Sequence, residues 1–235
     1  MGYGFPNYLE ASFPGDQHAL TQFTLCEHAR DIKFTVVANP FSRKHLLTIH
    51  DGSTFEGEIL AAVGRPMLAL QATICIHTIQ VGDTTIKMTV GTNDVHRRYR
   101  FSLDLGESYQ EKFEWRATKG NEVTNMFLNA TGYKLVRLGS VGPGNGKGGA
   151  RRNRHVDETS DGKEVVAVWA TEKDPLWMKF AKMIRPFKFE LRASGRSRKL
   201  GDLFNYVALA TALKIWSWEA QRYSSAPNGI PQLHC

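Results

Sequence analysis

The chain has 235 residues, of which 42% are hydrophobic and 23% charged. This composition excludes a largely disordered chain, and the length suffices for one large domain with a sizeable core. The net charge of +7 comes entirely from residues 141–235, which hold 16 basic and 9 acidic residues, so we expect an acidic partner on one part of the surface.

The first 22 residues carry no strong structural signal. They lack the basic start and the apolar block of a secretory signal peptide. We expect residues 1–22 to form a loosely ordered tail. The three cysteines, Cys26, Cys75 and Cys235, lie far apart in sequence, which excludes a disulfide framework and indicates a reducing, cytoplasmic compartment.

From Phe23 to Leu191 the sequence is typical of successive β-strands. Residues 73–90 form two strand-like arms around Gly82-Asp83, which predicts a hairpin. In residues 99–105 and 113–116, apolar and polar side chains alternate, as in strands with one buried face and one face in water. Strands at this density predict a mainly β fold, a sandwich or barrel, rather than alternating strands and helices.

The strand pattern stops between residues 139 and 162. This segment is rich in glycine and polar residues and predicts a disordered loop at about 140–162. Its GPGNGKGG stretch is not a phosphate-binding loop, because Val141 stands where the first glycine is required and Gly148 where serine or threonine is required.

Residues 174–186 (DPLWMKFAKMIRP) predict a short basic helix near 175–185, with Pro186 as its end. Apolar side chains repeat at helical spacing and basic ones three residues apart, as in a helix that lies on an anionic membrane surface. Alternatively, the apolar side chains plug one end of a barrel and the lysines are only solvated. Together with the following basic turn, the predicted lipid-binding residues are Trp177, Lys179, Lys182, Arg185, Arg196, Arg198 and Lys199.

The final predicted element is a helix from Leu203 to Gln221, and its apolar residues surround the whole helix axis. Leu209 and Trp216 lie opposite Val207. A helix of this kind is enclosed by protein or by lipid. The uncharged stretch of this helix is too short to span a membrane. We therefore expect a single domain over residues 23–222, a closed antiparallel β-barrel that encloses this helix, followed by a tail at 223–235.

A strand-rich chain that ends in a fully apolar helix resembles the tubby C-terminal-like architecture, which tubby proteins, plant LURP-one-related proteins and phospholipid scramblases share. The resemblance covers roughly Phe23 to Arg222 and is one of architecture. It implies a barrel of about twelve strands around a buried C-terminal helix. Because tubby proteins bind phosphoinositides through basic residues on the barrel exterior, it also implies a partner with anionic phospholipid head groups.

The resulting hypothesis is a non-enzymatic, cytoplasmic protein that contacts anionic phospholipid at a membrane periphery, without a metal, another cofactor or a transmembrane segment. The alternative is a small-molecule-binding protein, or an isomerase or cyclase of a biosynthetic pathway. Cys26-x-His28 and Cys75-x-His77 each predict a cysteine and a histidine on one strand face, a pair that can be nucleophilic but is more often structural.

A second basic cluster, HRRYR at residues 96–100, opens a predicted strand. We interpret it as a solubilising strand edge. It also raises nucleic acid as a partner, but the aromatic residues occupy inward strand positions rather than an exposed stacking surface. We therefore do not expect nucleic-acid binding.

Overall fold

A computed structural model describes residues 4–13, 22–28, 30–39, 42, 44–65, 67–68, 74–91, 98–106, 110–139, 157–172 and 186–224; at 67–68, 74–76, 91 and 220–224 only the backbone is described. The first strands are β1 (Tyr8–Ser12), β2 (Gln22–Cys26), β3 (Ile32–Ala38), β4 (His45–Asp51), β5 (Ile59–Gly64), β6 (Met67–Leu68) and β7 (Ile74–Val81). The remaining strands are β8 (Thr84–Gly91), β9 (Tyr99–Asp104), β10 (Gln110–Thr118), β11 (Ala130–Arg137), β12 (Glu164–Glu172) and β13 (Lys188–Leu191). The helices are α1 (Asn121–Thr124), α3 (Ala193–Arg196) and α4 (Gly201–Ser224).

The strands of the described ranges form one antiparallel sheet that closes on itself. Its order is β5-β4-β3-β2-β1-β13-β12-β11-β10-β9-β8-β7, and a further pairing of β5 with β7 completes a ring of twelve strands. The short strand β6 pairs with β7 beside this ring. The predicted fold class, a closed antiparallel β-barrel, is confirmed. Closure leaves the ring without an open sheet edge.

The predicted hairpin is also present. Strands β7 and β8 pair up to Val81 and Thr84, so Gly82 and Asp83 alone form the turn. Gly82 has a φ of 53°, a left-handed conformation that glycine adopts without strain.

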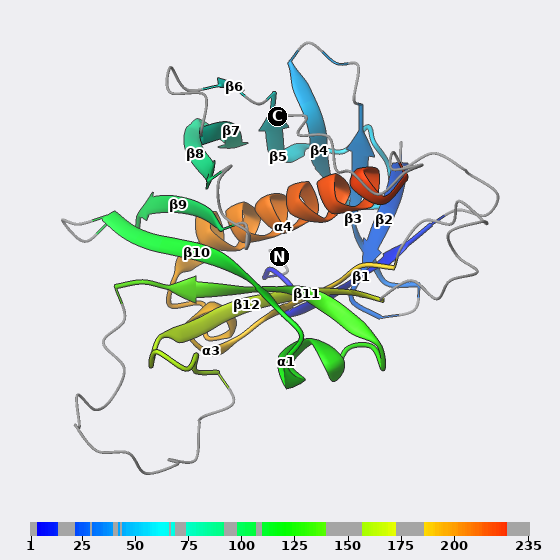
Figure 1. Cartoon of the computed structure of the whole chain (residues 1–235). Helices are drawn as coiled ribbons and strands as arrows, with labels where there is room; N and C mark the ends of the chain where they lie inside the picture. Colours follow the sequence, from blue (N-terminus) through cyan, green and yellow to red (C-terminus); the bar gives the residue numbers. More distant parts are fainter. Residues whose placement is uncertain are drawn as a thin grey trace, which may run out of the picture.

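Helix α4 fills the barrel. Figure 1 shows it, in orange and red, passing between strands on both of its sides. Val207, Leu209 and Trp216 are each no more than 1% exposed, although they lie on different sides of the helix. The indole Nε1 of Trp115 on β10 donates a 2.9 Å hydrogen bond to the hydroxyl of Thr211, which satisfies two polar groups inside the barrel. The prediction of a protein-enclosed C-terminal helix is confirmed.

The expected N-terminal tail contains a barrel strand, so that expectation is wrong for Tyr8–Ser12. Strand β1 pairs with β2 on one side and with β13 on the other. Leu9 is fully buried, and Phe5 is 5% exposed. The segment is too short to give a clear strand signal in the sequence. Its structure is fixed by the burial of these two side chains and by backbone hydrogen bonds to the strands on both sides.

The expected disordered loop is ordered in its last part. Thr159 accepts a hydrogen bond from the backbone N–H of Lys163 and closes a turn, and Glu158 forms a β-bridge with Glu164. The preceding residues 140–156, the predicted basic helix at 175–185 and the tail from 225 lie outside the described residues. No helix in the described ranges is both long and apolar enough to cross a membrane.

Candidate anion-binding site

Of the predicted lipid-binding residues, Trp177, Lys179, Lys182 and Arg185 lie outside the described residues. The other three are exposed: Arg196 ends α3, and Arg198 and Lys199 lie in the turn between α3 and α4. Arg196 Nη2 lies 2.6 Å from a carboxylate oxygen of Glu190, so this cation already has an anionic partner. The guanidinium of Arg198 packs against Gly4.

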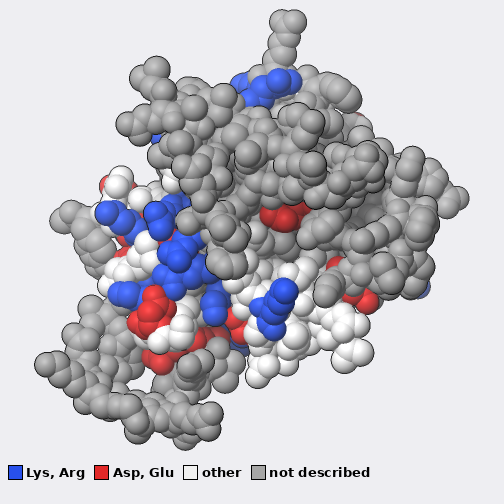
Figure 2. All heavy atoms as spheres, viewed as in Figure 1, with Lys and Arg blue, Asp and Glu red and all other residues white. Residues whose placement is uncertain are grey.

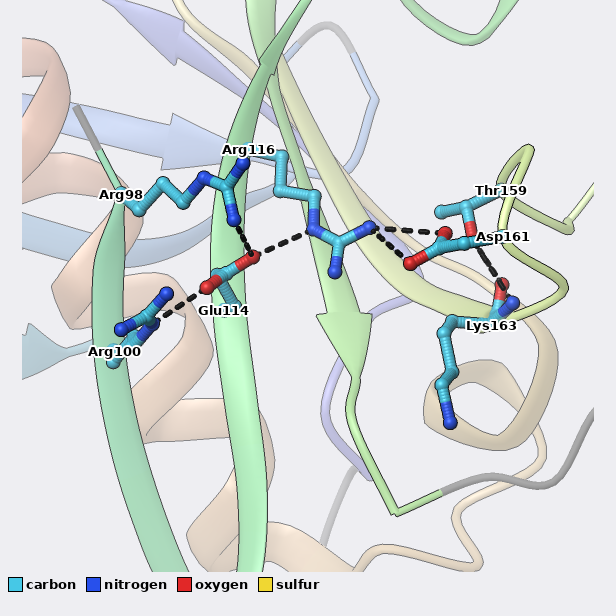
Figure 3. Close-up of polar contacts among 7 residues, drawn as sticks. All are labelled: Arg98, Arg100, Glu114, Arg116, Thr159, Asp161 and Lys163. Carbon is cyan, nitrogen blue, oxygen red and sulfur yellow. Dashed lines mark hydrogen bonds and ion pairs between the residues drawn. The ribbon is translucent and has the colours of Figure 1, made fainter. Parts of the chain in front are cut away.

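A denser group of cations lies on the outer face of the barrel, where three arginines surround Glu114 (Figure 3). Arg100 Nε lies 2.5 Å from Glu114 Oε2, and Arg116 Nε lies 2.7 Å from Oε1. Arg98 Nη1 lies 3.7 Å from Oε1. We call Arg98, Arg100, Glu114 and Arg116 the arginine site.

The strand register builds this site. Arg100 on β9 is directly opposite Glu114 on β10, so their side chains leave the same face of the sheet as close neighbours. Arg116 stands two residues after Glu114 on β10 and shares its outward face because strand side chains alternate. The intervening Trp115 points inward and is fully buried. Because side chains alternate along β10, Glu114 and Arg116 face outward while Trp115 between them faces the core.

Burial differs sharply between the anion and its cations. The Glu114 side chain is only 2% exposed, whereas the side chains of Arg98 and Arg100 are 50% and 56% exposed. Burial alone would raise the pKa of Glu114. Hydrogen bonds from Arg100 and Arg116, together with their positive charges, outweigh this effect and lower the pKa. Glu114 is therefore a charged anchor beneath the guanidiniums, and it holds them together against their mutual repulsion.

Arg116 connects the site to the turn that precedes β12. Its Nη1 donates to both carboxylate oxygens of Asp161, at 3.0 and 2.9 Å. Burial opposes the ionisation of Asp161, but hydrogen bonds from Thr159 and Arg116 lower its pKa overall. Arg116 thus faces two carboxylates, while Arg98 and Arg100 share the single charge of Glu114.

The site therefore carries a positive excess. Three guanidiniums face two carboxylates, and the exposed cations Lys87 and Lys112 occupy outward positions on the adjoining strands β8 and β10. Figure 2 shows Lys and Arg side chains gathered on the part of the surface where β9 and β10 lie in Figure 1.

The exposed guanidiniums can bind an additional anion. Towards the described carboxylates, Arg100 uses its Nε and Arg98 its Nη1. The remaining N–H groups of a guanidinium form a planar fork that suits two oxygens of a phosphate. Because a hydrogen bond to Glu114 fixes the position of Arg100, less conformational entropy is lost when an anion binds there.

The sequence interpretation of HRRYR as a solubilising strand edge missed this site. Its last two arginine positions, 98 and 100, supply two of the three guanidiniums. The sequence does contain a signal for this site: the alternating pattern places Arg100 on the outward face of one strand, and Glu114 and Arg116 on the outward face of the next. The pairing register that unites them comes only from the structure.

The Cys26-x-His28 prediction is wrong. Strand β2 ends at Cys26, the ladder with β3 shifts register between Leu25 and Cys26, and His28 lies exposed in the following turn. Cys26 itself is buried. The side chain of Cys75 lies outside the described set, whereas His77 is buried. In the described ranges, no three His, Cys, Asp or Glu side chains lie close enough together to hold a metal ion.

No protein-family model, no curated protein sequence and no solved structure matches this chain.

Proposed function

We propose that this chain is a non-enzymatic, tubby-like barrel protein that binds anionic phospholipid head groups through the arginine site. One observation carries the proposal: two half-exposed guanidiniums gather on the outer barrel wall around a carboxylate that is itself buried, with Arg100 hydrogen-bonded to it and Arg98 3.7 Å away. An ion pair that served only solubility would not require the burial of Glu114, because burying a carboxylate opposes its ionisation.

The architecture supports the same assignment. Helix α4 fills the barrel with apolar side chains, so the exterior is the surface open to a large anionic partner. The resemblance to tubby proteins, which bind phosphoinositides on the barrel exterior, agrees with this location. A phosphoinositide presents several phosphate oxygens at once and suits paired guanidinium forks better than a single carboxylate does.

Co-sedimentation with vesicles tests the proposal. The vesicles contain phosphatidylcholine alone, or with phosphatidylserine, or with a phosphoinositide. Each basic residue near an anionic surface contributes about 1 kcal/mol, so the double variant Arg98→Gln/Arg100→Gln is expected to weaken phosphoinositide binding by up to about 30-fold. The matched control Arg30→Gln/Lys44→Gln removes the same charge from exposed positions near β3 and β4, and we expect a loss below about threefold.

Binding should weaken steeply with salt, because the attraction is screened over a Debye length of about 8 Å at physiological ionic strength. If the wild-type protein does not bind phosphoinositide vesicles at low salt, the proposal is wrong. If the control variant loses as much vesicle binding as Arg98→Gln/Arg100→Gln, the attraction depends on net charge alone, and the arginine site is not the binding site. The triple variant Lys179→Gln/Lys182→Gln/Arg185→Gln, measured in parallel, tests the predicted basic helix as a second contact with the same membrane.

A further inference from the structure

A second cluster of chemically active side chains lies where α4 packs against β7 and β9, around the partly buried indole of Trp218 on α4. The ring of His77 on β7 is 5.6 Å from this indole between centroids, and the ring of Tyr99 on β9 is 6.1 Å from it. Lys214, one helical turn before Trp218, places its Nζ 5.8 Å from the same ring centroid. An amine and an imidazole therefore flank one aromatic ring.

The imidazole of His77 has an unusual environment. It is 1% exposed, and within the described part of the chain neither ring nitrogen has a hydrogen-bond partner. Burial, together with the positive charge of Lys214, lowers the pKa of His77 to about 3, so the ring is neutral at physiological pH. A buried polar group without partners destabilises a fold, and an apolar side chain here would avoid that cost. A ligand at this position would supply the missing partner.

The amine of Lys214 is also unusual. Burial lowers its pKa to about 8, so a substantial fraction is the neutral nucleophile near physiological pH. No carboxylate in the described ranges lies within ion-pair distance of it. The nearby acid, Glu219, instead accepts a 3.3 Å hydrogen bond from the hydroxyl of Tyr133, whose ring stands 5.7 Å from that of Tyr99.

We propose that Lys214 is a carbonyl-binding lysine that takes small aldehydes as a reversible imine, with His77 as the hydrogen-bond donor to the carbonyl oxygen. The neutral amine nitrogen attacks the carbonyl carbon and forms a C–N bond. The C–O bond then breaks, the oxygen leaves as water with the two amine protons, and a C=N bond remains. A neutral imidazole can polarise a carbonyl through its N–H. Trp218 supplies an apolar wall for the rest of the ligand.

Reductive trapping tests this proposal on the folded, full-length chain. The protein is incubated with propanal and sodium cyanoborohydride at neutral pH, and the labelled lysines are followed over time by peptide mass spectrometry. Lys87 and Lys112, exposed on the outer wall, are internal controls in the same digest. An amine of pKa about 8 holds far more neutral form than an ordinary lysine, so we expect Lys214 to be labelled at least about tenfold faster. Its rate should level off above about pH 8, and urea should abolish the difference.

Variants separate the two roles. Lys214→Met should remove the fast-labelled peptide and leave the controls unchanged. His77→Leu removes the N–H donor and should slow labelling of Lys214 several-fold, whereas His77→Gln keeps a donor and should partly restore it; near-ultraviolet circular dichroism checks that both fold. Labelling of wild-type Lys214 no faster than that of Lys87 and Lys112 overturns the proposal, whatever the variants do. An unchanged rate in folded His77→Leu overturns the role of His77.

Discussion

The substitution Glu114→Gln tests how the arginine site contributes to stability. It keeps the shape of the side chain but removes the charge that Arg100 and Arg116 approach at 2.5 and 2.7 Å. Hydrogen bonds to charged groups contribute about 1.5–3 kcal/mol each. Because Arg100 is 56% exposed and regains water when its partner is lost, we expect the two bonds together to contribute only about 2 kcal/mol. In a chain of this length, that loss lowers Tm by roughly 4–8 °C.

Urea unfolding of wild type and variant across pH gives the assay. The pKa of Glu114 is lower in the folded state than in the unfolded state. Its stabilisation is therefore complete above the unfolded pKa of about 4.3 and is lost as pH falls through the lower folded value. The difference between the two proteins should be full at pH 7 and fade below about pH 4.

A companion variant sharpens this test. Arg98→Gln removes a contact of 3.7 Å from a half-exposed side chain, so its expected effect on unfolding is below about 0.5 kcal/mol. A loss as large as that of Glu114→Gln, or a Glu114→Gln effect that persists undiminished at pH 3, would refute the reasoning.

Other substitutions probe the barrel itself. Trp216→Ala should reduce the free energy of unfolding by about 3–5 kcal/mol in denaturant titrations, because the indole is buried among aromatic rings and leaves a cavity; a loss under 1 kcal/mol contradicts an enclosed helix. Gly132→Ala should lower Tm, because a β-carbon there would collide with the backbone carbonyl of Trp169 on the neighbouring strand; an unchanged Tm shows that this approach can relax. Asp161→Asn should increase hydrogen exchange in residues 157–162, because Arg116 then faces one neutral oxygen instead of a carboxylate; equal protection would refute that anchoring role.

The sequence predicted those parts of the fold that depend on local pattern. Helix α4 was predictable because Leu209 and Trp216 lie on the side opposite Val207, and a helix with apolar residues on both sides needs protein all round. The β7–β8 hairpin followed from Gly82-Asp83 between two apolar arms. Strand β1 was missed, because Tyr8–Ser12 is ordered mainly by backbone pairing with strands that are remote in sequence.

The arginine site shows why function is harder to predict than fold. Alternation placed Arg100, Glu114 and Arg116 on the outer face, but the same alternation fits any register shifted by two residues. Only the pairing of Arg100 with Glu114 makes the carboxylate an anchor. Similarly, the sequence shows Lys214 as an interruption in an apolar helix, and only the packing of His77 against the same indole reveals a shared environment.

The pairing of β1 with β13 also sets an order of events during synthesis. Tyr8 lies opposite Glu190, so the second partner of β1 leaves the ribosome 182 residues later, which takes roughly 9–36 s at typical elongation rates. Helix α4 emerges later still, and until then the inward-facing aromatic residues of the sheet lack the helix against which they pack. The nascent chain thus carries unpaired strand edges and an uncovered apolar face for much of its translation. A chaperone that shields both during elongation should raise the yield of folded protein more than one supplied after release.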